Sequence, residues 1–537
     1  MTNNSVQPIY ILPEGTQRTS GRSAQRNNIY AAKLVAETVR TTLGPKGMDK
    51  MLVDSLGNVT VTNDGVTILQ EMHIEHPAAK MIVEVAKTQE NEVGDGTTTA
   101  VVLAGELLVN AEKLLDQKIH PTVIIKGYRL AAERALVELQ KLAHDVTIKD
   151  ETTLNHIAGT AMTGKGAEAA REHLSILAVK AIKHVARDTN GHTRVDLDDI
   201  TFVVSVGAPI EDTTLIEGIV LDKEPVHPGM PRRLENPKVL LLDLAVEIKD
   251  METDAKISIT DPKQLQQFFD MEETMLREMV ERIVSSGAKV VCCQKGVEDL
   301  AAYHLSKAGV LAVRRVRKSD LEKLAKATGA SIVSDMKDIS KTVLGSAGLV
   351  EERRVGENPM IFIEKCPAAK AVTFLVRGGT EHVAEEARRA ITDAVGDLRA
   401  TLETRKAVAG AGACEIALAR RIREYAASFS GRERLAVDCF ADSLEVIPRT
   451  LAENAGLDPI DVIADMKAAN VKSDHAGIDV FSGKVMDAWT QGVIEPLRIK
   501  TQAITSATEV ATMILRIDDV IASGRDTPNS QMEPDGD

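Results

Sequence analysis

The hexapeptide Gly94-Asp95-Gly96-Thr97-Thr98-Thr99 stands immediately before a long apolar stretch that ends near Leu115. The apolar residues recur at helical spacing, so the hexapeptide lies at a predicted helix N-terminus. Such an end offers unpaired backbone N–H groups and a partial positive charge, which suit phosphate oxygens. Asp95 would repel a phosphate unless a divalent cation, most simply Mg²⁺, bridges the two groups. A glycine turn with Thr97 capping the helix explains the same six residues equally well.

The residues before the hexapeptide also read as mostly helical. Ile29, Ala32, Ala36, Val39 and Leu43 recur at steps of three and four, which predicts a helix that Gly44-Pro45 ends. Residues 51–53 and 59–61 are typical of two arms of a β-hairpin, and Pro121 suits the first turn of a further helix.

Composition excludes several classes of protein. The chain has 537 residues and a formal charge of −14, which offers no basic surface for nucleic acid. No apolar stretch is long enough to span a bilayer, and the N-terminus does not read as a secretion signal. Five cysteines without a CxxC spacing suit a reducing compartment, so we expect a cytoplasmic protein without structural zinc.

The predicted secondary structure changes in the middle third of the sequence. Between about 208 and 367, short β-like runs alternate with helical stretches, which indicates an α/β unit with parallel strands. The shorter flanking segments, 151–207 and 368–405, could be two halves of one connecting domain. From about 408 the chain reads as helical again, which an insertion of the middle into a domain built from both ends would explain. Residues 525–537 are polar and are expected to be disordered.

Three further glycine-rich segments have structural explanations that composition favours. Leu43-Gly44-Pro45 is explained by a helix stop, although a backbone without Cβ could approach a ribose or base. Asn63-Asp64-Gly65 is an ordinary turn by composition, with a functional carboxylate as the lesser reading. Residues 409–413, Ala-Gly-Ala-Gly-Ala, precede a helix and favour close packing over a base contact.

Two charged residues have similarly open interpretations. Residues 159–166 follow a phosphate-loop pattern until Gly166 replaces the required hydroxyl, so a Walker-type site is rejected and Lys165 reads as a solvated loop residue. Asp393 lies on a helix predicted over 381–406, on the face opposite Ile391, where composition favours a solvated position. Cys292 and Cys293 lie in an apolar run that predicts burial.

The helix predicted after Pro262 carries a stripe rich in Met and Phe, following a charged segment from 247 to 256. Such a stripe is usually core, but if its first turns projected they would form an adaptable surface for many partners.

Taken together, the chain resembles a group II chaperonin of the archaeal thermosome type. The order and spacing of five sequence segments match that family over essentially the whole folded chain. The segments that carry the resemblance are TLGPKGMDKM (42–51), TNDG (62–65), GDGTTT (94–99), TGKGAE (163–168) and EPLR (495–498).

The resemblance implies a multidomain α plus α/β fold. A helical equatorial ATP-binding domain would comprise 1–148 and 406–537, and a small intermediate hinge domain 149–216 and 370–405. An apical α/β domain, 217–369, would bind substrate and carry a helical lid protrusion at about 247–283. Non-native client proteins would be enclosed in a double ring of identical or paralogous subunits, without a separate lid co-chaperonin and without nucleic acid or membrane partners.

The resemblance also implies roles for individual residues in Mg²⁺-dependent ATP hydrolysis, with K⁺ as a further candidate ion. Asp95 would bind Mg²⁺, and Asp393 and Asp64 would act on the attacking water near the γ-phosphate, which Lys165 would sense. The implied nucleotide contacts are Leu43, Gly44 and Pro45 at the sugar-phosphate edge, Gly96, Thr97, Thr98 and Thr99 at the phosphates, and Gly412 and Glu495 at the adenine or ribose. The family usually has three consecutive glycines where this chain has Gly410-Ala411-Gly412, and the added methyl of Ala411 could crowd the ribose.

Two other functions fit parts of the sequence. An actin-like sugar or acetate kinase could use a similar phosphate loop, although there the loop joins two strands. A ring-shaped holdase with a vestigial nucleotide site would bind clients without releasing phosphate from ATP.

Overall fold

The computed structural model describes residues 17–189, 192–248, 262–356, 358–367 and 371–522. The chain forms two compact units. The first joins the N-terminal part up to His144 to the C-terminal part from Ala407, and the second runs from Asp145 to Lys406. The middle of the chain is therefore inserted into a unit made from both ends. The finer boundaries expected inside the second unit, at 216/217 and 369/370, stay predictions.

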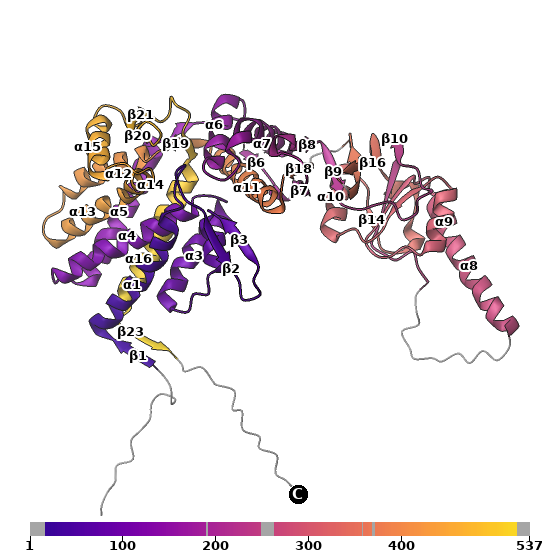
Figure 1. Cartoon of the computed structure of the whole chain (residues 1–537), viewed down its shortest axis with the longest axis horizontal. Helices are drawn as coiled ribbons and strands as arrows, with labels where there is room; N and C mark the ends of the chain where they lie inside the picture. Colours follow the sequence, from indigo (N-terminus) through magenta and orange to yellow (C-terminus); the bar gives the residue numbers. More distant parts are fainter. Residues whose placement is uncertain (1–16, 190–191, 249–261, 357, 368–370, 523–537) are drawn as a thin grey trace, which may run out of the picture. The chain divides into compact units, whose positions relative to one another are not determined.

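The first unit is built around helices whose apolar faces bury one another (Figure 1). The helix that follows the hexapeptide lies at its centre, and Gly105 lets it approach the first long helix so closely that an added Cβ would lie 2.4 Å from Cβ of Ala36. Aliphatic side chains fill most of this core, with Tyr128 and Phe440 in edge-to-face contact at 5.7 Å. The helices are α1 (Gly21–Arg40), α2 (Gly65–Glu71), α3 (Pro77–Glu92), α4 (Thr97–Asp116), α5 (Pro121–Leu142), α12 (Ala413–Ala426), α13 (Arg432–Leu444), α14 (Val446–Asn454), α15 (Pro459–Asn470) and α16 (Leu497–Arg516).

Short sheets complete the first unit. The predicted hairpin is confirmed, with Met51 opposite Val61 in an antiparallel pair. Helix α1 ends at Arg40 and not at Gly44, because Thr42 turns the chain and its hydroxyl donates to the carbonyl of Val39 at 2.8 Å. The strands are β1 (Gln17–Ser20), β2 (Lys50–Val53), β3 (Val59–Thr62), β4 (His144–Asp145), β19 (Lys406–Ala409), β20 (Ala476–Asp479), β21 (Lys484–Asp487), β22 (Ile494–Pro496) and β23 (Asp519–Ala522).

The second unit contains the predicted parallel sheet, in the order β13-β12-β11-β14, with β15 pairing antiparallel to β11. Alternate residues of β11 enter two different cores: Val239 and Leu241 face one, and Leu240 and Leu242 face the other. Both faces are buried, as parallel strands require. The members are β11 (Lys238–Leu242), β12 (Val290–Cys293), β13 (Leu311–Val313), β14 (Ile332–Val333), β15 (Gly345–Ser346), and helices α8 (Pro262–Ser285), α9 (Asp299–Lys307) and α10 (Lys318–Thr328).

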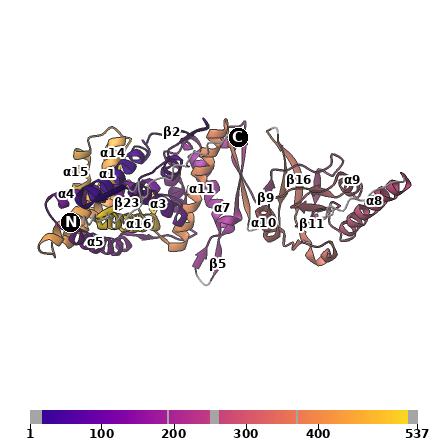
Figure 2. The same cartoon turned by 90° about the horizontal axis from the view of Figure 1, so that it is seen from below.

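Two further sheets belong to the second unit. One has the order β10-β16-β17-β9, and the other has the order β7-β18-β8. Helix α11 packs against α6 and α7, and Figure 2 shows α11 beside α7. Strands β5 (Arg187–Thr189) and β6 (His192–Arg194) form a separate antiparallel pair. The remaining elements are α6 (Glu151–Met162), α7 (Arg171–Val185), β7 (Ile200–Val206), β8 (Thr214–Ile216), β9 (Gly218–Leu221), β10 (Arg233–Glu235), β16 (Leu349–Val355), β17 (Asn358–Glu364), β18 (Val372–Gly378) and α11 (Glu381–Thr404).

The Met- and Phe-rich stripe divides along α8. Leu276 and Ile283 are buried in the core of the second unit, whereas Met271 and Met275 are 63% and 48% exposed. The side chains of residues 265, 268 and 269, residues 249–261 of the expected protrusion and the tail 525–537 lie outside the described residues.

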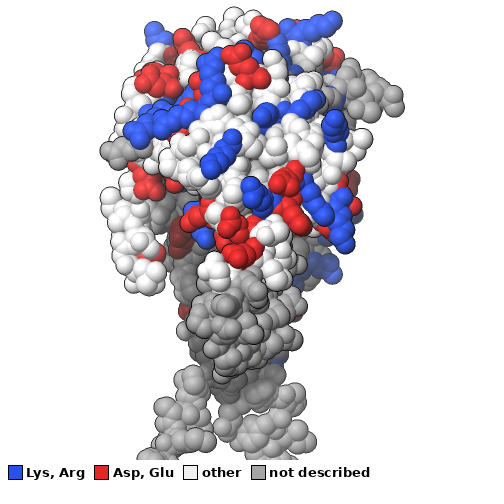
Figure 3. Space-filling view, turned by 90° about the vertical axis from the view of Figure 1, so that its right-hand side faces the viewer, with Lys and Arg blue, Asp and Glu red and all other residues white. Residues whose placement is uncertain are grey.

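Surface charge is mixed. The face shown in Figure 3 carries Lys and Arg interspersed with Asp and Glu, so it presents no field of a single sign. Among the described helices, none combines the length and the apolar character that crossing a membrane requires.

Candidate functional site

The hexapeptide forms a left-handed glycine turn at the start of α4. Gly94 and Gly96 have φ of +95° and +78°, and Gly96 is the N-cap of the helix without any capping side chain. The alternative in which Thr97 caps the helix is therefore wrong, because Thr97 is already the first helical residue. Gly96 has no side chain that could cap the helix, and an anion is the kind of partner that the first-turn N–H groups of such an end attract.

Gln89 holds this turn against the first turn of α16. Its side chain is fully buried, and Nε2 donates to the carbonyl oxygens of Asp95 at 2.9 Å and of Ile499 at 3.3 Å. A Cβ on Gly96 would lie 2.5 Å from Cγ2 of Ile499, so only glycine fits there. Sequence reasoning missed Gln89. The signal was present, because Gln89 follows Val85 and Ala86 at helical spacing and so lies on the apolar face of α3.

Asp64 and its turn lie against the first turn of α4. A Cβ on Gly65 would be 2.6 Å from Oγ1 of Thr98. The Asp64 carboxylate caps α2, accepting from the backbone N–H of Thr67 at 3.0 Å and from its hydroxyl at 2.6 Å. The turn predicted from composition is thus present, beside the threonines of the hexapeptide.

Two other glycine segments meet the same helix, α14. A Cβ on Gly44 would lie 2.3 Å from Cδ2 of Leu451, and one on Gly412 would lie 2.6 Å from Cβ of Pro448. Asn454, at the end of α14, donates from Nδ2 to the carbonyl oxygen of Leu43 at 2.9 Å. The Leu43-Gly44-Pro45 turn and Gly412, which are more than 360 positions apart, therefore flank one helix.

Ala411 lies between Gly410 and Gly412 with φ of +54°, in the left-handed region that alanine disfavours. Its Cβ also approaches Gly477, where an added Cβ would lie only 3.0 Å away. The departure from three glycines is therefore accommodated at a cost in backbone strain.

Replacing Ala411 by Gly should raise the free energy of unfolding by about 0.5–1 kcal/mol, because the strain of left-handed alanine exceeds the added entropy of glycine in the unfolded chain. Chemical denaturation of the two proteins measures the difference. Ala413→Gly is the matched control: Ala413 opens α12, so glycine there should lower stability by up to about 1 kcal/mol. Equal losses of stability in both variants would show that Ala411 is not strained.

Glu495 lies on strand β22, opposite Val408 of β19, and reaches the Gly410 segment. A Cβ on Gly410 would lie 2.7 Å from Oε1 of Glu495. Lys500, on the first turn of α16, pairs with Glu495 and, at 2.8 Å, with Glu415 of α12. Burial raises the pKa of Glu495, as do the charges of Glu415 and Asp95, whereas Lys500 opposes the rise.

The predicted site residues of the second unit form an ion pair. Nζ of Lys165, in the loop after α6, lies 2.6 Å from Oδ2 of Asp393 on α11. Their side chains are 18% and 14% exposed, so the solvated positions favoured by composition are wrong for both. All other candidate residues belong to the first unit.

The cysteines are structural. Cys292 and Cys293 are fully buried, as predicted, and burial raises their pKa values to about 12 and about 11. Both thiols therefore stay protonated and are poor nucleophiles and metal ligands. Within the described part of the chain, no group of three or more His, Cys, Asp or Glu side chains could hold a metal ion by itself.

The arrangement in the first unit can bind an extended anion. A phosphate chain would fit the end of α4, where no side chain caps the helix, and the Asp95 carboxylate beside it would offer a hard oxygen ligand to a divalent cation. Because the described protein ligands alone do not form a metal cluster, such a cation would complete its coordination with phosphate oxygens and water.

Comparisons with known proteins give a consistent result. The model of the TCP-1/cpn60 chaperonin family matches residues 35–525. The chain is 63% identical to thermosome subunit beta of Archaeoglobus fulgidus over 96% of this chain and 95% of that protein. It is 61% identical to the thermosome subunit of Methanopyrus kandleri over the same shares of the two chains. A solved structure, the open-state monomer of a group II chaperonin from Methanococcoides burtonii, is 46% identical with a TM-score of 0.61, covering 79% of this chain and 100% of that one.

Proposed function

The chain belongs to the TCP-1/cpn60 chaperonin family, and from this membership together with its geometry we propose where it binds ATP and how it hydrolyses it. It has the multidomain fold of a group II chaperonin and is an ATP-dependent chaperone, and hence an ATPase, that acts in protein folding. Membership in this family excludes the actin-like kinase that the hexapeptide alone left open.

We place ATP in the first unit, which contains the α4 turn, α16 and both glycine turns beside α14. The observation that carries this proposal is the link from the α4 turn through Gln89 to α16, together with the two glycine turns that flank α14. Gly96 to Thr99 would hold the phosphates, Leu43, Gly44 and Pro45 the sugar-phosphate edge, and Gly412 and Glu495 the adenine or ribose.

Asp95 and the phosphate oxygens would hold Mg²⁺, which when bound neutralises phosphate charge; K⁺ is a further candidate ion. Hydrolysis needs a positioned water more than covalent chemistry. Asp393 would orient or deprotonate that water, Asp64 would lie near it, and Lys165 would sense the γ-phosphate. Asp393 is paired with Lys165 in this structure. To accept a proton from water, its carboxylate must break this ion pair or use its other oxygen.

We further propose that the subunits form a double ring that encloses non-native proteins, with a lid built into the second unit near α8. The family and the alpha and beta subunits named in Archaeoglobus fulgidus support a ring of identical or paralogous chains. A reducing compartment such as the cytoplasm suits the five cysteines, which are all free thiols.

The experiment that tests this function measures phosphate release and recovery of a denatured client enzyme, with and without ATP, and images the purified particles. Stacked rings, ATP-dependent recovery and phosphate release are expected. Single compact particles would contradict the ring, and client binding without phosphate release would indicate a holdase.

Chelation of divalent cations should abolish phosphate release, and Asp95→Asn should raise the Mg²⁺ concentration for half-maximal activity by about tenfold. The substitution keeps the shape of the side chain but replaces an anionic ligand oxygen by a neutral amide oxygen, and a tenfold shift corresponds to about 1.4 kcal/mol. A titration of activity against Mg²⁺ at saturating ATP measures the shift. Asp54→Asn is the control, because that exposed carboxylate only caps the β2–β3 loop. An unchanged Mg²⁺ requirement in Asp95→Asn would remove Asp95 from the metal site.

A further inference from the structure

A buried lysine lies between two carboxylates beside the proposed nucleotide site. The side chains of Lys500 and Glu415 are each 6% exposed, and that of Glu495 is 21% exposed. Nζ of Lys500 lies 2.8 Å from Oε1 of Glu415 and contacts Oε2 of Glu495. One ammonium thus serves two carboxylates that come from different elements, α12 and β22.

The charges of this cluster depend on one another. Burial alone lowers the pKa of Lys500, but attraction to Glu415 and Glu495 outweighs burial and raises that pKa above its usual value. Lys500 is therefore charged, and the three groups carry a net charge of −1 when both carboxylates are ionised. Asp95 adds a further negative charge whose repulsion reaches Glu495. Removing Lys500 would leave like charges facing one another away from water, which is strongly unfavourable.

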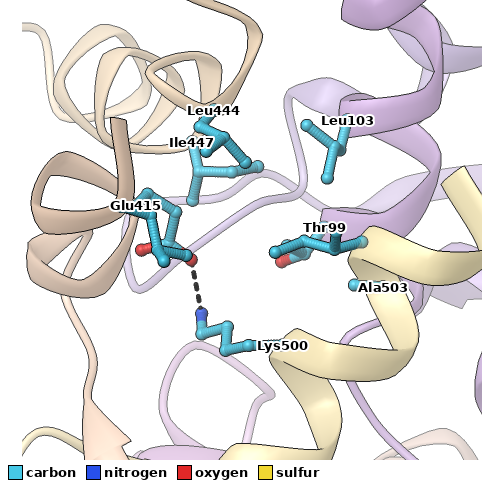
Figure 4. A pocket seen from close by; sticks show the side chains of 9 residues that line it. Thr99, Leu103, Glu415, Leu444, Ile447, Lys500 and Ala503 are labelled. Atoms are coloured by element: carbon cyan, nitrogen blue, oxygen red, sulfur yellow. Dashed lines mark ion pairs between the residues drawn. The ribbon is translucent and has the colours of Figure 1, made fainter. Parts of the chain in front are cut away.

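Glu415 depends on Lys500 in particular. Its Oε2 is buried without a hydrogen-bond partner among the described residues. The cluster borders a small cavity that also contacts Thr99 of α4, and Figure 4 shows Lys500 directed at Glu415 with Thr99 facing them across the cavity. The cavity is small, so at most about one water could take over the contacts of the lysine.

Glu495 has little freedom on its other side. Its Oε1 lies against Gly410, where a Cβ would approach to 2.7 Å, and its backbone pairs with Val408. Since its side chain is 21% exposed, a Glu495 carboxylate that is repelled by Glu415 would relieve the repulsion by turning toward solvent or by taking up a proton. Either response displaces or weakens the acceptor that a ribose or adenine group would use.

We propose that Lys500 is a positioning residue for ATP: it neutralises Glu415, pairs with Glu495 and thereby holds the Glu495 carboxylate oriented toward the nucleotide. The inference rests on the proposed nucleotide site, of which Glu495 is a member. Lys500 acts through Glu495 and need not touch ATP. Loss of Lys500 should therefore weaken ATP binding and change the rate of the chemical step little.

The test is a double-mutant cycle in the full-length protein, with KM and kcat for ATP hydrolysis and direct ATP binding as readouts. Lys500→Met should raise KM by about tenfold while kcat changes by less than about threefold. Adding Glu415→Gln to Lys500→Met should recover most of the loss, because it removes the repelling charge and leaves the cavity unchanged. Lys500→Arg should lie between the wild type and Lys500→Met, since it keeps the charge.

Controls separate this inference from general damage and from the proposed site itself. Arg353→Met breaks a part-buried ion pair with Glu364 in the second unit, which is more exposed than the Lys500 pairs, and should leave KM unchanged. If Glu495→Gln changes KM but Lys500→Met does not, or if Glu415→Gln fails to rescue it, the role of Lys500 is refuted. If Glu495→Gln itself leaves ATP affinity unchanged, the nucleotide site is misplaced and the inference falls with it.

Discussion

Replacing Asp393 by alanine is expected to lower kcat for ATP hydrolysis by roughly 10²–10⁴, the range that a general base contributes, while ATP affinity stays within about twofold. The physical reason is the proposed division of roles: Gly96 to Thr99 of the first unit would hold the phosphates, whereas Asp393 of the second unit would act on the water. The carboxylate would therefore act on the attacking water without helping to hold the nucleotide. Single-turnover phosphate release and ATP binding, measured separately, give the two quantities.

The matched control for Asp393 is Glu385→Ala on the same helix. Glu385 pairs with Arg388 at 2.7 Å on a half-exposed part of α11, so its loss tests damage to the helix without touching the Lys165 pair. Hydrolysis should stay within about twofold of the wild type, as expected for loss of an exposed ion pair. If Asp393→Ala hydrolyses ATP at the wild-type rate, Asp393 has no part in the chemistry.

Replacing Gly96 by alanine is expected to lower kcat/KM for ATP by about 100-fold, because a displacement of about 1 Å at a reacting group can cost that much. The new Cβ would lie 2.5 Å from Cγ2 of Ile499 and 3.1 Å from Nε2 of Gln89. The turn would have to move away from α16, and the first N–H groups of α4 would move with it. The left-handed φ of +78° adds strain of about 1–2 kcal/mol.

Gly57→Ala separates the clash from the strain. Gly57, in the loop between β2 and β3, has φ of +87°, but an added Cβ there meets nothing within 4 Å. That variant should lose stability by a similar amount of strain and keep its ATPase activity. A second substitution that shortens the obstructing side chain, Ile499→Ala, should restore part of the activity of Gly96→Ala. Full activity in Gly96→Ala would show that the turn does not hold the phosphates.

The sequence predicted the local elements well where short-range physics decides them. The hairpin at 51–61, the parallel α/β unit in the middle and the helix starts at the hexapeptide 94–99 and at Pro121 are all confirmed. Apolar residues that recur every second position, or every third to fourth position, indicate a strand or helix with one buried face. A proline or glycine marks the position where a helix can begin. The end of α1 was placed too late because a threonine hydroxyl turned the chain before the glycine.

The candidate site was less accessible to the same reasoning. Motif resemblance selected Gly44, Asp95 and Glu495, whereas Gln89, Asn454 and Lys500 were missed. Gln89 and Asn454 are polar groups that join segments about 400 positions apart. Lys500 is a charge buried within an apolar helix face. Lys500 lies in the stripe of α16 that also contains Ala503, Ile504 and Ala507, and a lysine at such spacing is a signal that could have been used.

What the sequence alone determined was the order of helices and strands, the turns that require glycine and the family to which the chain belongs. Only the tertiary structure decided which distant groups meet: Lys165 with Asp393, Gln89 with Ile499, and Lys500 with Glu415 and Glu495. Backbone conformation and amphipathic patterns depend on neighbours within a few positions, so they can be read along the chain. The partner of a buried polar group depends on how whole elements pack, because burial makes a partner obligatory without specifying which one.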